Sequence, residues 1–147
     1  MIEFGNIAHG EKIAKAAGFS LNSVHDMIIT RSEHGELYGG VVLYDYTKRS
    51  ISMHVAGFVN NWINRDILWA TFFFPFRELG CASIFCQARS NATHARRFIE
   101  KIGFHIEVVI SDVFPDADLV VYRMYGKDCP WMNIRPRGIT FGGNNGR

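Results

Sequence analysis

Three runs in the first half of the chain are rich in β-branched and aromatic residues. They cover residues 24–31 (VHDMIITR), 38–46 (YGGVVLYDY) and 51–59 (ISMHVAGFV), and the polar turns SEHGE and TKRS separate them. In the third run, side chains of alternate positions fall on opposite faces, as the period of two in a β-strand requires. The pattern therefore predicts an antiparallel meander of three strands.

Three other segments carry apolar residues at helical spacing. They are residues 9–18, 64–80 and 90–104. The second is apolar on nearly every side, which is typical of a helix buried against a sheet, and Asn64 is placed to cap its start. Pro75 has no N–H to donate, so we expect it to bend this helix.

Further strands are predicted at residues 83–89, 104–110 and 118–125, with a turn at Pro115-Asp116. The predicted order is then helix, three strands, helix, strand, helix and two strands. This order predicts a mixed α/β fold, an antiparallel meander followed by a β-α-β-α-β half. The parallel crossover runs from 51–59 through the second helix to 83–89.

The size and composition favour one folded domain. The chain has 147 residues, of which 48% are hydrophobic and 14% aromatic, and this suffices for a sizeable core. We expect a single domain over 1–132. The segment 133–147 is rich in Gly, Asn and Arg and lacks periodicity, so it is expected to be a tail.

Charge and cysteine content exclude several classes of protein. A net charge of +2 does not indicate bulk binding of nucleic acid. Three cysteines without a CxxC pair indicate neither a disulfide framework nor a zinc site, so no metal is expected. The longest apolar stretch is too short to span a bilayer, and we expect a soluble, cytoplasmic protein.

The second half of the chain resembles the GNAT-type acyl-CoA N-acyltransferases. The matching pieces are FFPFRELGCASIFCQARSNATHARRFIEKIGFHIE, which ends at residue 107, and DLVVYRMYGKDCPW at 118–131. An aromatic-x-x-Leu-Gly helix end, a strand, an Asn-started helix ending Glu-Lys-x-Gly-Phe and a further strand occur in that order. The resemblance is strongest to the branch that acetylates ribosomal-protein N-termini, and it extends to small acyltransferase-like proteins of bacteriophages.

The resemblance implies that acetyl-CoA is the co-substrate. In this fold the two central parallel strands separate, and the pantetheine arm bonds the exposed strand edge while the phosphates meet a helix N-terminus. Asn91 would offer its side-chain amide to the pantetheine arm. The residues expected to contact acetyl-CoA are Phe58, Val59, Asn60, Asn64, Arg65, Asp66, Asn91, Arg96 and Arg97.

The sequence also departs from the family pattern. The phosphate loop of the family falls on Asn60, Ile63 and Arg65, and both of its glycines are missing. The family's frequent Tyr, which protonates the departing thiolate, falls on Ile99. Asn91 is one residue further from the Gly-Phe ending than is usual.

Two residues are candidates for proton transfer. His54, in the middle of the third strand, is the candidate base because its ordinary pKa suits that task. Tyr122, on the last strand, is the candidate proton donor. The alternatives are a sheet histidine bonded to a neighbour and a tyrosine that only packs. Arg96 and Arg97, likewise, either contact phosphate or form a solvated helix face.

Together these observations predict an N-acetyltransferase that transfers an acetyl group directly to a primary amine, either a protein N-terminus or a small molecule. The alternative is a catalytically degenerate protein of the same fold that serves as a structural or partner-binding module, as the missing glycines and Tyr suggest. We expect no nucleic-acid or membrane partner, and a homodimer is possible.

Overall fold

The computed structural model describes residues 1–134, 136–138 and 141–142. The strands are β1 (Ile2–Phe4), β2 (Met27–Glu33), β3 (Glu36–Tyr44), β4 (Ser50–Gly57), β5 (Ser83–Arg89), β6 (His105–Phe114), β7 (Ala117–Tyr125) and β8 (Phe141–Gly142). The helices are α1 (Ile7–Ala17), α2 (Arg65–Phe73) and α3 (Thr93–Ile102). The predicted mixed α/β class is confirmed. Strands β1 and β8 were not predicted, because two or three residues are too few to show a periodicity.

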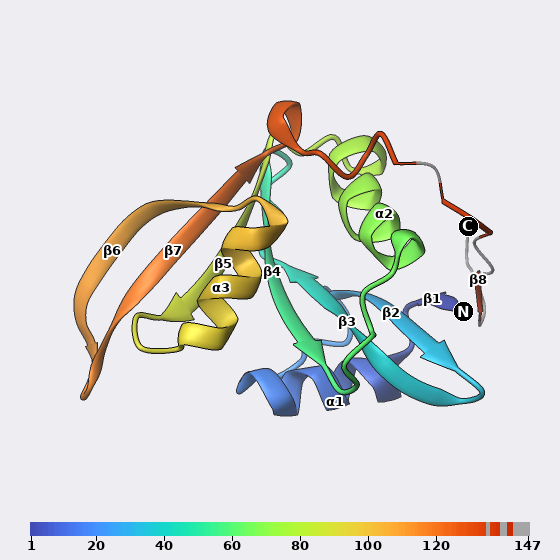
Figure 1. Cartoon of the computed structure of the whole chain (residues 1–147), viewed down its shortest axis with the longest axis horizontal. Helices are drawn as coiled ribbons and strands as arrows, with labels where there is room; N and C mark the ends of the chain where they lie inside the picture. Colours follow the sequence, from blue (N-terminus) through green and yellow to red (C-terminus); the bar gives the residue numbers. More distant parts are fainter. Residues whose placement is uncertain (135, 139–140, 143–147) are drawn as a thin grey trace.

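All eight strands join one sheet in the order β6-β7-β5-β4-β3-β2-β1-β8. Pairing is antiparallel except between β4 and β5 and between β1 and β8. Strands β2, β3 and β4 form the predicted meander, and the chain crosses from β4 through α2 to the parallel β5, also as predicted. Within the described part of the chain, β6 and β8 are the two edges (Figure 1).

The helices divide between the two faces of the sheet. Helix α1 packs on β2, β3 and β4, whereas α2 and α3 lie on the other face (Figure 1). The larger core lies between the sheet and the α2–α3 layer and includes Ile29, Met53 and Phe72. The smaller core, under α1, contains Ile13, Ile28 and Val42.

Helix α1 has a polar cap at its start and a glycine at its end. Asn6 accepts a hydrogen bond from the His9 N–H at 3.0 Å, which starts the helix two residues before the predicted position. Gly18 follows the last turn with φ 78°, in the left-handed region that glycine occupies without strain. The predicted end at Gly18 is confirmed.

The predicted helix 64–80 is interrupted at Pro75. After α2 ends at Phe73, the residues Phe74–Glu78 form a π-helical turn, in which the Leu79 N–H donates to the Phe74 carbonyl at 3.0 Å. Because Pro75 cannot donate to the Thr71 carbonyl, the wider turn replaces the regular one. A bend was predicted at Pro75, and the structure shows a change from α-helix to π-helix at this position.

Candidate functional site

Strands β4 and β5 pair over only part of their length. Their parallel register ends where Met53 stands opposite Cys86. Beyond that point β4 continues to Gly57 paired with β3, and β5 continues to Arg89 paired with β7. Within the described residues, the β4 segment 54–57 therefore has no strand on its β5 side. The predicted separation of the central strands is confirmed, and Figure 1 shows it.

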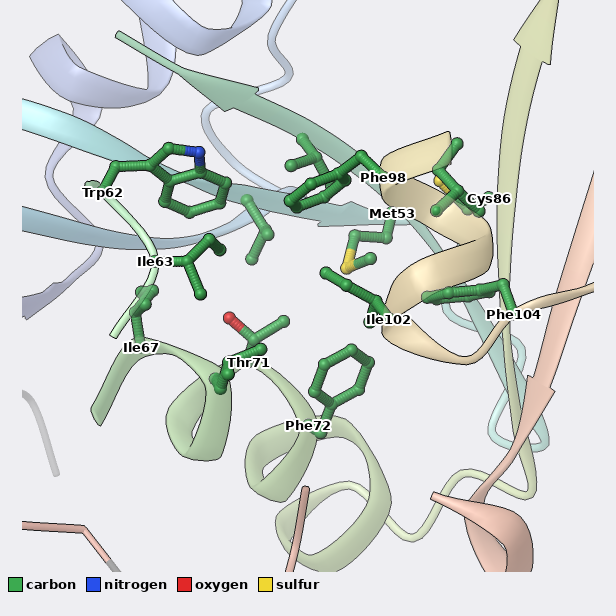
Figure 2. Close-up of a pocket in the computed structure, with 14 residues that line it drawn as sticks. Met53, Trp62, Ile63, Ile67, Thr71, Phe72, Cys86, Phe98, Ile102 and Phe104 are labelled. Atoms are coloured by element: carbon green, nitrogen blue, oxygen red, sulfur yellow. The ribbon is translucent and has the colours of Figure 1, made fainter. Parts of the chain in front are cut away.

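An apolar hollow lies beside this separation, between α2, α3 and the sheet. Its free volume is only about 20 Å³, room for about one water molecule, and we call it the α2–α3 hollow. Its lining includes Met53, Trp62, Thr71, Cys86, Phe98 and Ile102 (Figure 2). The Thr71 hydroxyl and the Trp62 indole nitrogen are the polar side-chain groups that Figure 2 draws there. The hollow is thus a small gap between closely packed, mainly apolar side chains.

Trp62, in the loop between β4 and α2, covers one end of this hollow. Its indole lies over Gly39 and Gly57, which are register partners on β3 and β4. A Cβ added at Gly39 would lie 2.5 Å from an indole carbon, and one added at Gly57 would lie closer still. On the other side the Trp62 ring centroid is 6.0 Å from that of Phe98 on α3. The indole therefore bridges the sheet and α3 and is only 9% exposed.

Arg31 on β2 holds the loop that carries Trp62. Its Nη1 donates to the carbonyls of Asn61 at 2.6 Å and Trp62 at 2.9 Å. The guanidinium lies 5.0 Å from the ring centroid of Tyr38 and pairs with Glu33. Neither Arg31 nor Trp62 was among the residues predicted from the sequence. The glycines inside the strand patterns were the available signal, because a strand glycine often marks a close approach.

The start of α2 brings together several residues predicted to contact phosphate. Asn64 caps the helix by accepting from the Ile67 N–H at 2.9 Å, as predicted. Arg65 is exposed beside it. The Asp66 carboxylate lies in the first turn and accepts from the Arg137 backbone N–H at 2.8 Å. The helix N-terminus and Arg65 favour an anion, whereas the Asp66 charge opposes it.

The loop residues that precede α2 are exposed or partly exposed. Phe58 is 44% exposed, and its N–H donates to the Tyr38 carbonyl at 2.9 Å. Asn60 is exposed, and the Val59 carbonyl accepts from the Trp62 N–H at 3.3 Å. These residues lie between the open β4 segment and the start of α2. The predicted acetyl-CoA contacts from Phe58 to Asp66 are therefore on one continuous stretch of the chain.

His54 lies on the face of the sheet that α1 covers, opposite the α2–α3 hollow. Its ring is stacked between Phe19, at a centroid distance of 3.8 Å, and Tyr44, at 4.3 Å. Burial lowers the pKa of His54, while Asp26 and Asp45 oppose part of this shift. His54 is therefore neutral at neutral pH, which is the state a proton acceptor requires. Its backbone stands at the first residue of the open β4 segment.

Tyr122, fully buried on β7, belongs to a polar cluster that joins β7 to α3. Its hydroxyl donates to the Glu100 carboxylate at 2.6 Å and accepts from Arg96 Nε at 2.9 Å. Arg96 also donates to the Ser90 carbonyl at 3.0 Å. Burial, followed by the bond to Glu100, raises the pKa of Tyr122. The Arg96 guanidinium is thus engaged within the protein, whereas Arg97 is exposed.

Tyr122→Phe is expected to lower the free energy of unfolding by about 1 to 2 kcal/mol, because it removes the buried hydroxyl that joins Glu100 and Arg96, which keep only their ion pair at 3.7 Å and the bond to Ser90. Urea unfolding of the variant measures this. Tyr125→Phe is the control, because it removes an exposed hydroxyl that accepts from Arg123 at 2.6 Å, and equal stability of the two variants would show that the buried cluster contributes no more than a surface hydrogen bond.

Asn91 does not cap α3. The N-cap residue is Ala92, which has no side-chain hydrogen bond, and the Asn91 amide donates to Asp116 at 3.4 Å in the turn between β6 and β7. This agrees with the extra residue counted between Asn91 and the Gly-Phe ending. The positions that correspond to the family's Tyr are apolar: Phe98 lines the hollow, and Ile99 is buried.

Neither the cysteines nor a cluster of metal-ligating side chains forms a second candidate site in the described part of the chain. Cys81, Cys86 and Cys129 are free and buried. Burial raises the pKa of Cys86, in the wall of the hollow, to about 12, so it is a thiol near neutral pH. No three His, Cys, Asp or Glu side chains converge among the described residues. None of the described helices is both long and apolar enough for a membrane span.

Comparison with known proteins gives a match in structure alone. No family model matches the sequence, and no curated protein matches it. A GNAT-family acetyltransferase from Bacillus anthracis superimposes with a TM-score of 0.60 at 14% identity, over 84% of this chain and 87% of that one. A structure assigned to the same family, from Desulfovibrio desulfuricans, gives a TM-score of 0.66 at 15% identity, over 86% of this chain and 99% of the other.

A third similar structure contains acetyl-CoA. The Salmonella typhimurium protein yncA, solved with acetyl-CoA, matches with a TM-score of 0.58 at 13% identity, over 85% of this chain and 75% of that one. Identities this low establish architecture and leave the chemistry to the site. The eight-stranded mixed sheet with its separated central strands thus has the fold of the GNAT acetyltransferases.

Proposed function

We propose that this protein is an acyl-CoA-dependent N-acyltransferase that moves an acetyl group from acetyl-CoA to a primary amine. The observation that carries the proposal is the β4 segment 54–57, which has no strand partner on its β5 side among the described residues and whose Val55 lines the α2–α3 hollow. Such a segment can bond the two amides of a pantetheine arm as it would bond another strand. The α2–α3 hollow has room for about one water molecule, so the arm would lie along the open strand edge and not inside the hollow.

The residues present fit the other parts of acetyl-CoA to different degrees. The start of α2, with Asn64 and Arg65, provides N–H groups and one cation for the phosphates. Phe58, Val59 and Asn60 lead from the open β4 segment to that helix. Asp66 reduces the fit, and Arg65 would have to offset its charge.

The α3 side contributes less to this site. Arg96 is held by Tyr122 and Ser90, so of the two arginines Arg97 is the freer to approach a phosphate. Asn91 can reach the arm only after it leaves Asp116. We therefore assign the pantetheine contacts mainly to the β4 backbone.

The transfer itself needs little acid catalysis. The amine nitrogen bonds to the acetyl carbon, the carbon–sulfur bond breaks, and the amine proton passes to His54 through water. A thiol has an ordinary pKa of about 8.5, so the departing thiolate can take its proton from solvent. Tyr122 can donate instead only if its hydroxyl leaves Glu100.

His54→Ala is expected to lower the rate of thiol release by about 100-fold. Because the pKa of His54 is lowered, the wild-type rate should stay high below the ordinary histidine pKa and fall only at more acidic pH. Thiol release measured against pH with a panel of amines and peptide N-termini checks both points. His25→Ala, on an exposed turn, is the control, and an unchanged rate in His54→Ala would reject His54 as the base.

The acceptor proposed is a protein N-terminus, as in the ribosomal-protein branch, or a small amine. A spermidine N-acetyltransferase chimera with a Vibrio cholerae component shares the fold, with a TM-score of 0.57 over 69% of this chain, which favours including polyamines in the panel. Binding is tested first, by thermal shift with acetyl-CoA. An unchanged Tm at concentrations well above micromolar would remove the enzyme proposal.

A non-catalytic role is the second candidate, and the position of Trp62 favours it. The indole already fills the space over Gly39 and Gly57 beside the open segment, and Asp66 places a negative charge where phosphate would bind. Such a protein would keep the fold and serve a partner, as a phage-related module could. Binding of acetyl-CoA without thiol release for any acceptor would support this candidate.

A further inference from the structure

In the proposed complex, the acyl group lies at the closed end of the gap between β4 and β5. The phosphates meet the start of α2, which follows β4 along the chain, so the pantetheine arm runs along the open segment from Gly57 towards His54. The thioester then reaches the point where the pairing of the two strands ends, at Met53 and Cys86. The space around this point therefore decides how long an acyl group can be.

Ahead of the thioester and on one face of the sheet, this space is already taken. Directly ahead, β4 and β5 are paired from Ser50 to Met53. On the face that α1 covers, the His54 ring is stacked between those of Phe19 and Tyr44, and the proposed amine approaches on this face. A longer acyl chain would have to turn towards the opposite face, into the α2–α3 hollow.

The α2–α3 hollow begins where the thioester would end, because Met53 and Cys86 both line it. Its free volume is about 20 Å³, which is room for about one water molecule. Protein interiors are close-packed, and methylene groups inserted into them force the surrounding side chains to move. The hollow therefore excludes a chain of several methylene groups as long as its lining stays in place.

Phe98 closes the hollow on the side of α3. Across from it, Met53, Val55 and Gly57 are alternate residues of β4 and share the face of the sheet that the hollow occupies. The Trp62 indole covers Gly57, and the Phe98 ring centroid lies 6.0 Å from that of Trp62. Figure 2 shows Phe98 in the lining together with Met53 and Trp62. The Phe98 ring thus fills the space between α3 and the side chains that β4 presents.

We propose that the Phe98 side chain restricts the donor to short acyl groups, so that acetyl is preferred over butyryl and longer chains. With the ring in place, a longer chain meets paired strands ahead, His54 on one face and a filled hollow on the other. Without the ring, its space joins the hollow, and the chain can lie against Met53 and Ile102. This role rests on the proposed function, because it requires the arm to lie along 54–57.

Thiol release from acetyl-CoA, butyryl-CoA and hexanoyl-CoA tests the role of Phe98, with the amine that reacts fastest in the acceptor panel. The wild type is expected to favour acetyl-CoA over hexanoyl-CoA by about 100-fold or more in kcat/KM. Phe98→Ala should reduce this ratio by about tenfold or more, mainly through a lower KM for hexanoyl-CoA. Phe98 is partly exposed, whereas Met53 and Cys86 are buried, so its truncation disturbs the fold less than theirs would.

Phe73→Ala is the matched control. Phe73 is also partly buried, but it lies on α2 outside the lining of the hollow and stacks on Trp69 at a centroid distance of 4.3 Å. The control should leave the ratio of the two donors unchanged. Phe98→Leu removes less volume and should give an intermediate ratio, which tests the role even if Phe98→Ala does not fold. Far-UV circular dichroism verifies the fold of each variant.

Two results would overturn the role of Phe98 while acetyl transfer itself still proceeds. One is a ratio that Phe98→Leu and Phe98→Ala leave unchanged, or that Phe73→Ala changes equally. The other is a wild type that uses hexanoyl-CoA as well as acetyl-CoA, because the hollow would then set no length limit. Absence of thiol release with every donor would reject the proposed function as well, so the two failures are distinguishable.

Discussion

Trp62→Ala is expected to lower the free energy of unfolding by about 3 to 5 kcal/mol, the usual cost of truncating a buried large aromatic side chain. The indole is 9% exposed and contacts both the sheet glycines and Phe98 on α3. Its removal joins the vacated space to the α2–α3 hollow. Arg31 binds backbone carbonyls of the same loop, and Trp62→Ala keeps these two hydrogen bonds. The variant therefore loses the packing of the indole but not the bonds that hold the loop to β2.

Urea unfolding followed by circular dichroism measures this loss. Trp69→Ala is the matched control: Trp69 lies on α2 with one face stacked on Phe73 and is only partly buried, so its loss should cost less. A Trp62→Ala variant as stable as the wild type would show that the indole does not pack as described.

Gly57→Val is the second large change, with an expected loss of roughly 3 kcal/mol from overpacking. The added side chain would occupy the space of the Trp62 indole, so either the indole leaves or β4 shifts. Gly39, its register partner, also lies against the indole, so Gly39→Ala should also destabilise the protein.

A double-mutant cycle distinguishes a clash with the indole from a general sensitivity of β4 to a larger side chain at position 57. In the Trp62→Ala background, Gly57→Val should cost much less, because the atom that it meets is gone. The free energies of unfolding of the wild type, the two single variants and the double variant complete the cycle. Additive losses would contradict a direct contact between position 57 and the indole.

Most of the fold could be predicted from local pattern. The strands, the cap at Asn64 and the end at Gly18 follow from residue types whose backbone preferences act over a few positions. The separation of β4 and β5 was predicted through the family resemblance, since no periodicity reports where two strands cease to pair. Strand β8 depends on a distant partner, β1, and gave no local signal.

The site was less accessible to sequence reasoning, because its geometry depends on contacts between distant residues. Trp62 packs on Gly39 and Gly57, and its loop is held by Arg31, two strands away. Tyr122 meets Arg96 and Glu100 only once α3 folds on β7. The roles predicted for His54, Tyr122 and the phosphate-loop residues remain predictions that the experiments above address.

Amide hydrogen exchange along β4, with and without acetyl-CoA, tests the central claim most directly. If the pantetheine arm bonds the open strand edge, the amides of 54–57 that point away from β3 should exchange more slowly, by about tenfold or more, when acetyl-CoA is present. Amides of β2, which lies beyond β3, serve as the internal reference. Saturable binding that leaves exchange in 54–57 unchanged would contradict the account.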